Sequence, residues 1–467
     1  MNILKRLPGL VLIMLISISA YPCSSFKLQK GDKLVYGHNL NEGDIGVPGL
    51  IFINKRGIFK QGRSWSELTT PDYSNASDHS WISRYGSVTF NNFGRDFPDG
   101  GMNEVGLFVW ETNETIEYPK NEGLPKLNQM NWMQYMLDNC LTLEEAVQCA
   151  YEFEIDGWGW HYFVGDAQGN TAAIAFIDGE VVIHMNKDMP IPGLFNTPYE
   201  RELELLQYYK GNGGSYEVEL DNPEVPRFVK TAAMIENYQE DEDIVDYGLY
   251  MLDKLMVNDV PEWSILCDAR KMQVHFKTRV NPEIKVISFS DIDFSNESPV
   301  LIVNMDIEEG GDVIKQFTPY TNQKMRSFYE EFMVPLLPEE FFTRNGITMD
   351  EYINRVCTHS DAAALKENQV FYGTWKNISL KENDDIEAMI VLKTKGEAVF
   401  VSISIDEGNS DFYHTEHLLM IRNKLSFTFI SKDYTMIEVK ALIEEKKMQV
   451  DFNGIEDYYG SYVLHKE

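Results

Sequence analysis

The pattern of apolar residues changes from strand-like to helical and back along this chain of 467 residues. Short apolar stretches separated by turn residues predict strands within residues 26–111. Apolar side chains spaced three and four apart predict helices within 127–153. Strands and helices are then predicted in turn at 160–184, 199–210, 226–256 and 263–288. This order favours an α+β domain that is built of packed layers and ends near residue 342.

The remainder of the chain has a different character. Residues 343–366 are charged and have a helical pattern, which predicts a helical linker. From residue 367 to residue 467 the apolar side chains alternate, which predicts a separate β-rich domain, either a small all-β barrel or a sandwich. A chain of this length exceeds one ordinary hydrophobic core, and two domains are therefore expected.

Residues 1–22 have the composition of a secretory signal peptide. Lys5 and Arg6 give a basic start, residues 7–19 are almost wholly apolar, and Ala20 is a small residue near the expected cut. This apolar run is shorter than the ~20 residues that a bilayer-spanning helix needs. No later stretch is long and apolar enough to span a membrane. We therefore expect an exported protein, periplasmic or extracellular, without a transmembrane segment.

Cleavage after residue 22 would make Cys23 the first residue of the mature chain. Cys23 would then carry a thiol nucleophile and a free α-amine able to act as its base. The amine titrates near pKa ~7.7–8.0 and a free cysteine near ~8.5, so both groups lie close to working pH. Such an activated thiol forms acyl-enzymes during amide cleavage. In the competing interpretation Cys23 is acylated as a lipid anchor, although Tyr21-Pro22 matches that processing poorly.

The charge balance excludes some classes of partner. The chain has 41 Lys and Arg against 73 Asp and Glu, a formal net charge of −32, and this acidity disfavours nucleic acids and anionic membrane surfaces. Besides Cys23 the chain has four cysteines that either pair or remain as lone buried thiols, namely Cys140, Cys149, Cys267 and Cys357. No CxxC motif or His/Cys cluster suggests a metal site, and no metal or organic cofactor is expected.

Four segments carry a family resemblance. They are Cys23-Ser24-Ser25-Phe26, Gly101-Met102-Asn103-Glu104-Val105-Gly106-Leu107, Phe195-Asn196-Thr197-Pro198-Tyr199 and Pro226-Arg227-Phe228-Val229. In this order they resemble the choloylglycine hydrolase family of linear amide C–N hydrolases, which includes conjugated bile acid hydrolases and penicillin V acylases. The resemblance covers roughly residues 23–330. It implies a four-layer αββα N-terminal-nucleophile (Ntn) hydrolase domain, which we place at 23–342.

The resemblance also implies roles for individual residues. Cys23 is the expected nucleophile and its own α-amine the base. Asn196 is expected to offer its side-chain amide to the oxyanion, and a backbone N–H from the strand end between Glu111 and Asn113 is the expected second donor. Arg227 is expected to hold the polar network of the site without losing its charge.

Two positions depart from the family pattern. His38 stands where the family usually has an arginine, and Asn41 stands where it has an aspartate bonded to the N-terminal amine. A neutral His38 could orient or polarise the thiol or act as a base. Asn41 can accept a hydrogen bond from the amine but supplies no negative charge, so the pKa of the amine is less supported. An altered substrate, reduced activity and an inactive paralogue all remain open.

The expected function is that of an exported hydrolase. It would cleave linear, non-peptide amide bonds of small N-acyl substrates through an acyl-enzyme on Cys23. The alternatives are a catalytically impaired binding protein with the same fold and a lipid-anchored surface protein. Family members often assemble as homotetramers, which makes a homo-oligomer an implied but open property.

Overall fold

The computed structural model describes residues 23–41, 48–70, 76–114, 116–121, 123–256, 263–337, 339–377, 388–405, 411–413, 417–430, 436–453 and 460–467. The expected signal peptide, residues 1–22, lies outside the described residues. None of the helices within these ranges is long and apolar enough to cross a bilayer.

A seven-stranded sheet carries the N-terminal segment that begins at Cys23. Its order is β14 (Gly193–Leu194), β1 (Ser24–Lys30), β2 (Lys33–Leu40), β15 (Trp263–Asp268), β16 (Gln273–Thr278), β17 (Lys285–Ser288) and β19 (Gly311–Asp312). Helix α6 (Ile244–Lys254) packs on β2 and β15, and α5 (Arg227–Asn237) packs on β1 and β14. Helix α4 (Tyr199–Leu206) lies against α5.

A nine-stranded sheet forms the second large element. Its order is β13 (Glu180–Met185), β12 (Thr171–Ile177), β11 (Trp160–Gly165), β8 (Phe108–Asn113), β7 (Gly100–Asn103), β6 (Ser87–Asn91), β3 (Leu50–Asn54), β18 (Leu301–Asn304) and β20 (Thr318–Pro319). Helix α2 (Gln129–Asn139) packs on β7 and β8, and α3 (Leu143–Gln148) packs on β11 and β12.

Aromatic side chains join the two sheets. Tyr36 of β2 stacks on Phe108 of β8 with ring centroids 5.1 Å apart, and Phe90 of β6 meets Phe276 of β16 at 5.7 Å. These residues belong to one buried apolar cluster, which also contains Cys23. The mixed α/β class is confirmed, whereas the four-layer description remains a prediction. The first core therefore surrounds the residue predicted to be the nucleophile.

Smaller elements complete this part of the fold. They are β4 (Phe59–Gln61) paired with β5 (Ser80–Ile82), β9 (Lys126–Asn128) paired with β10 (Glu154–Asp156), and α1 (Trp65–Thr69). Helix α1 begins with a capping box between Ser64 and Glu67, and α3 begins with one between Thr142 and Glu145.

The segment predicted to be a linker is helical but is packed against the second sheet's core. Helices α7 (Asn322–Phe328), α8 (Glu339–Asn345) and α9 (Met349–Thr358) precede the C-terminal part. Tyr352, Ile353 and Val356 of α9 are buried in the same cluster as α2. These residues are buried because they form the apolar face of α9. The sequence alone did not show which part of the fold this face packs against. The domain boundaries at 342/343 and 366/367 remain predictions.

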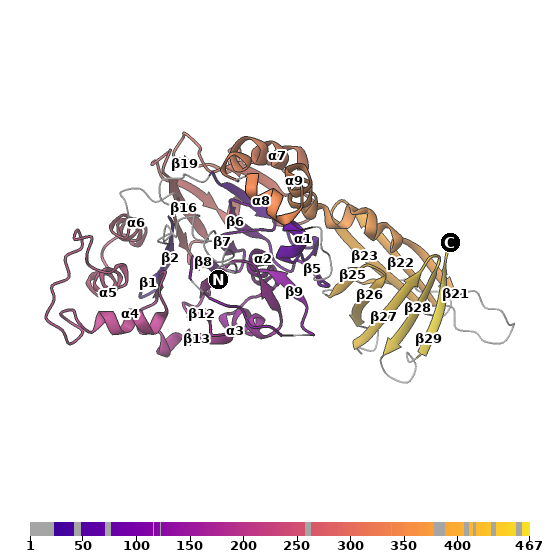
Figure 1. The fold of residues 1–467 in the computed structure, drawn as a ribbon, viewed down its shortest axis with the longest axis horizontal. Helices are drawn as coiled ribbons and strands as arrows, with labels where there is room; N and C mark the ends of the chain where they lie inside the picture. Colours follow the sequence, from indigo (N-terminus) through magenta and orange to yellow (C-terminus); the bar gives the residue numbers. More distant parts are fainter. Residues whose placement is uncertain are drawn as a thin grey trace, which may run out of the picture.

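The C-terminal part contains one antiparallel sheet of nine described strands. Its order is β24 (Asp411–Tyr413), β23 (Ala398–Ile405), β22 (Ala388–Lys395), β21 (Gly373–Asn377), β29 (Gly460–Lys466), β28 (Lys447–Asn453), β27 (Met436–Glu444), β26 (Lys424–Ile430) and β25 (Leu418–Ile421). The sheet curves as a half-barrel at the far end of the molecule from α4 and α5 (Figure 1). In the described strands β24 and β25 are edges, so the predicted small barrel or sandwich is replaced by an open, curved sheet.

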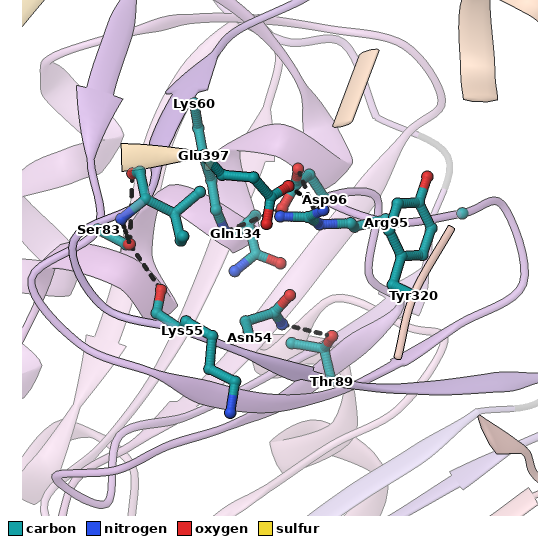
Figure 2. A network of polar contacts seen from close by, with 12 residues as sticks. Asn54, Lys55, Lys60, Ser83, Thr89, Arg95, Asp96, Gln134, Tyr320 and Glu397 are labelled. Atoms are coloured by element: carbon teal, nitrogen blue, oxygen red, sulfur yellow. Dashed lines mark hydrogen bonds and ion pairs between the residues drawn. The ribbon is translucent and has the colours of Figure 1, made fainter. Parts of the chain in front are cut away.

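A buried polar network fastens this sheet to the remainder of the chain. Glu397, in the turn between β22 and β23, forms an ion pair with the fully buried Arg95, and its carbonyl accepts a hydrogen bond from Phe59 N. Figure 2 shows Arg95 extending between Glu397 and the ring of Tyr320. Beside it Lys60 Nζ lies 2.9 Å from both Asp96 and Asp138. Ser80 adds hydrogen bonds to Leu418 and Met420 of β25.

Candidate active site

Cys23 lies at the start of β1, between two neighbouring strands of the same sheet. Its side chain is buried, with 1% of its surface exposed. On one side Ser25 pairs with Leu194 of β14, so the chain that leaves β14 brings Phe195 and Asn196 next to Cys23. On the other side Ser24 pairs with Asn39 of β2. The register of three strands therefore places segments separated by about 170 residues around one thiol.

Arg227 reaches this site from the first turn of α5. Pro226 precedes the helix, where a proline is tolerated because its missing N–H would have no helical partner. The guanidinium donates to the Cys23 carbonyl, to Ser24 Oγ at 2.8 Å and to Asn196 Oδ1 at 3.0 Å. Burial lowers the pKa of Arg227 to about 10, partly offset by Cys23 and Glu202, so the group stays charged at neutral pH. Arg227 therefore fixes the main chain of Cys23.

Asn196 is held from both ends of its carboxamide. The oxygen accepts from Arg227, and Nδ2 donates to the Asn113 carbonyl at 2.8 Å. An amide nitrogen has two hydrogens, so a second N–H of Asn196 is left to point at another acceptor. Oxyanion stabilisation needs a fixed donor, and Arg227 links the carboxamide of Asn196 to the main chain of Cys23.

His161 positions the segment that carries Asn196. Its Nε2 contacts the Phe195 carbonyl, and because a carbonyl only accepts, Nε2 carries the proton. Burial lowers the pKa of His161 to about 4, so the ring is neutral. Sequence reasoning missed this contact, because nothing local indicates that β11 passes beneath Phe195.

The structure reduces the set of backbone N–H groups that could serve as the predicted second oxyanion donor. The backbone N–H of Glu111 already donates to the Asp99 carbonyl at 3.3 Å, so Glu111 does not supply that donor in this arrangement. Asn113 pairs with Trp160 of β11 at the end of β8, and its carbonyl binds Asn196. Among the described hydrogen bonds, Asn113 is thus linked to a predicted site residue, Asn196, and Glu111 is not.

His38 is fully buried between the two sheets. Its Nδ1 lies 2.8 Å from Ser25 Oγ, and its ring stacks on Trp110 with centroids 4.1 Å apart. Burial holds the pKa of His38 well below 6.5, so the imidazole is neutral. Nε2 has no hydrogen-bond partner among the described residues. His38 therefore does not supply the positive charge that an arginine would bring to this position.

Asn41 follows β2 directly and is buried, with 1% exposed, while Glu42 lies outside the described residues. Two residues earlier, Asn39 donates to the Leu252 carbonyl of α6 and accepts from Ser264 Oγ, both at 2.8 Å. The described part of this strand thus carries amides and no carboxylate.

A buried carboxyl group that sequence reasoning missed lies on α4. Glu202 is 5% exposed, and its side chain is hydrogen-bonded to Thr197, next to Asn196. Burial raises its pKa to about 7, while the charge of Arg227 and the Thr197 hydrogen bond act in the opposite direction. Glu202 is therefore a buried carboxyl group that interacts electrostatically with Arg227. This interaction depends on the packing of α4 against α5, which the sequence pattern does not indicate.

The turn between β7 and β8 has a structural role. Asn103 Nδ2 donates to the carbonyls of Leu137 and Cys140, and Asn103 Oδ1 accepts from the N–H groups of Val105 and Leu107. This motif residue therefore closes the turn that feeds β8. In the described ranges no group of three His, Cys, Asp or Glu side chains is arranged to hold a metal ion.

The chain is similar in sequence to a known acylase. No family model matches the chain. Penicillin V acylase from Pectobacterium atrosepticum is 26% identical over 263 residues, covering 46% of this chain and 69% of that protein. The predicted relationship to the choloylglycine hydrolase family is confirmed.

Solved structures add a likeness in fold. Penicillin V acylase from Agrobacterium tumefaciens is 21% identical and aligns with a TM-score of 0.55, covering 64% of this chain and 98% of that chain. A conjugated bile acid hydrolase variant from Clostridium perfringens is 16% identical with a TM-score of 0.47, covering 62% of this chain and 99% of that chain. More than a third of this chain thus lies outside each of these two alignments.

Proposed function

We propose that this protein is an amide hydrolase that uses Cys23 as its nucleophile once residues 1–22 are removed. The observation that carries the proposal is the convergence on Cys23. Arg227 holds the Cys23 carbonyl and Asn196 together, and Asn196 in turn binds Asn113. These residues come from β1, the loop after β14, the start of α5 and the end of β8. A relationship to penicillin V acylase supports the same chemistry.

The mechanism follows from the groups around the thiol. The α-amine of Cys23 takes the thiol proton, and sulfur attacks the amide carbonyl carbon. The second N–H of Asn196 receives the developing oxyanion, a contribution of about 10²–10³ in rate for one such donor. The amine returns the proton to the leaving nitrogen, and an acyl-enzyme remains. Water, deprotonated by the same amine, then releases the acid and regenerates the thiol.

Arg227 acts in this mechanism as a positioning residue. It donates to the carbonyl of Cys23, so it fixes the main chain from which both the amine and the thiol project. Its bond to Asn196 sets the orientation of the oxyanion donor at the same time. The guanidinium of Arg227 thus positions both Cys23, the proposed nucleophile, and Asn196, the proposed oxyanion donor.

The proposed substrates are small N-acyl amides with a bulky apolar acyl part and a small polar amine. Penicillin V, after which the relative from Pectobacterium atrosepticum is named, is itself an N-acyl amide, which supports this class. We further propose that the protein is exported to the periplasm or the extracellular space, on the strength of the composition of residues 1–22.

A catalytically impaired binding protein is the second candidate. It is favoured by the neutral His38 and by Asn41, which together remove two charges from the neighbourhood of Cys23. A lipid anchor on Cys23 is a third candidate, and it would block the α-amine.

The test begins with the N-terminal sequence and intact mass of protein recovered from its native exported fraction. An unmodified chain beginning at Cys23 should hydrolyse phenoxymethylpenicillin or an N-acyl amino acid, and Cys23→Ala should abolish the activity. Cys23→Ser is the matched variant that keeps a weaker nucleophile. Lipid on Cys23, retained Tyr21-Pro22, or activity that survives Cys23→Ala would each overturn the proposed mechanism.

A further inference from the structure

Two cysteine sulfurs lie close together away from the candidate active site. The Sγ atoms of Cys140 and Cys149 are 3.6 Å apart. Each side chain is 3% exposed, and the two residues end helices α2 and α3, respectively. The two thiols thus face one another although the connection 140–142 and the whole of α3 separate them in the chain.

The main chain holds both cysteines in place. Cys140 N–H caps α2 by donating to the Met136 carbonyl, and the Cys140 carbonyl accepts from Asn103 Nδ2 at 2.9 Å. The Cys149 carbonyl accepts from Trp132 Nε1 at 3.1 Å. These hydrogen bonds fix the main chain at both cysteines. The two sulfur atoms therefore lie close together because α2 and α3 pack on the second sheet.

We propose that Cys140 and Cys149 form an intramolecular disulfide when the protein meets an oxidising thiol–disulfide environment. A disulfide needs an S–S distance of about 2.05 Å, which side-chain rotation and a small movement at the end of α3 can provide. Two S–H bonds break and one S–S bond forms. The two electrons and two protons pass to a small-molecule or protein disulfide, which is reduced to two thiols.

The alternative use of paired thiols is to bind a metal ion. A structural zinc site needs four ligands, and no third His, Cys, Asp or Glu joins this pair in the described part of the chain. The pair is thus suited to covalent closure.

Burial determines when the disulfide forms. The Cys149 hydrogen bond and burial raise the pKa of Cys140 well above its usual value, so the folded chain presents little of the thiolate that attacks a disulfide. Leu141 follows Cys140 directly and Tyr151 is two residues after Cys149, and they are 40% and 52% exposed, so exposed residues lie close to both cysteines in the chain. We expect oxidation during folding or local opening of α3, and slow oxidation of the closed native state.

The inference does not depend on the proposed hydrolase activity. It does leave the Cys23 thiol out of the disulfide, since the pairing consumes two other cysteines. Cys267 on β15 and Cys357 on α9 are buried elsewhere in the fold and serve as internal references.

The test uses the purified full chain, refolded with a mixture of oxidised and reduced glutathione and then denatured and alkylated. Three alkylated cysteines are expected after oxidation and five after full reduction. Glutamyl endopeptidase cleaves after Glu144 and Glu145, which lie between the two cysteines, so an oxidised sample should yield two peptides joined by a reducible bond.

Matched variants keep the test decisive. Cys267→Ser and Cys357→Ser should each lower the number of alkylated cysteines by one and leave the joined peptides unchanged. The double variant Cys140→Ser/Cys149→Ser should lose the joined peptides and show a thermal midpoint that reductant does not change, whereas reductant should lower that of the parent chain. Five alkylated cysteines after oxidative refolding, or Cys140 joined to a different cysteine, would overturn the inference.

Discussion

Replacing Arg227 by lysine retains a positive charge but removes the planar fork that binds three acceptors. The guanidinium serves the Cys23 carbonyl, Ser24 Oγ and Asn196 Oδ1 at once. A lysine ammonium at the end of a flexible stem can replace one of these bonds with good geometry. Two charge-assisted hydrogen bonds are then lost, at about 1.5–3 kcal/mol each in favourable settings. Because Arg227 is only partly buried, we expect the lower end, about 3 kcal/mol of unfolding free energy.

The same substitution should affect catalysis more than binding. Asn196 loses the bond to its carboxamide oxygen, so its remaining N–H is no longer held toward the oxyanion. We expect kcat for an N-acyl amide to fall by about 10²-fold with a small change in KM, because the lost interaction is made in the transition state.

Two assays separate these effects. Urea unfolding of Arg227→Lys measures the stability change whether or not the chain is active, and steady-state hydrolysis measures the catalytic one. Arg201→Lys is the matched control, because Arg201 is 61% exposed on α4 and pairs only with the exposed Glu204 among its described contacts. If Arg227→Lys matched the parent in both assays, Arg227 would not be what positions Cys23 and Asn196.

Three further predictions concern buried charges. Asp138→Ala removes the acceptor of Lys60, of Trp81 Nε1 at 2.8 Å and of Gln134 Nε2 at 2.9 Å, and should lower the unfolding free energy by about 3–5 kcal/mol in a denaturant titration; a loss below about 1 kcal/mol would show that water replaces these bonds. Glu202 has its pKa raised to about 7 from 4.5, so its contribution to stability is complete below pH 4.5 and is lost as pH rises through about 7. Glu202→Gln should therefore flatten the dependence of the unfolding free energy on pH in that window, and an unchanged profile would contradict the shift. Asn41→Asp places a carboxylate beside the N-terminal segment, which raises the pKa of the α-amine and makes it a stronger base, so amidase activity should rise most clearly at and above neutral pH, where the amine is deprotonated; a fall in kcat/KM would argue against a lost charge at this position.

The sequence was informative where a signal is local. The strand pattern around Cys23, the capping box at Thr142 and the motif segments containing Asn196 and Arg227 are all read within a few neighbouring residues. Residue type then limits the chemistry, since a guanidinium and a carboxamide have few alternative uses near a thiol. The mixed class and the family relationship were predicted on this basis.

The sequence was uninformative where a partner is distant. The helical segment before residue 366 was predicted to be a linker, yet Tyr352 and Ile353 lie in the core beside α2. The β-rich part was predicted to be a barrel or sandwich, but its described strands form one open sheet whose turn residue Glu397 enters the network around Arg95 (Figure 2). Closure and packing depend on strand order and curvature, which an alternating pattern does not encode.

The sequence by itself determined the inventory of the proposed site: one thiol behind an expected cleavage point, an amide, a guanidinium, and two neutral side chains at positions where the family resemblance implies charges. Only the tertiary structure decided that Arg227 binds both Cys23 and Asn196, that His38 is bonded to Ser25 and stacked on Trp110, and that Glu202 lies near Arg227. The physical reason is that burial and pairing set the charge state and direction of a side chain. Both depend on strand register and helix packing between residues far apart in the chain.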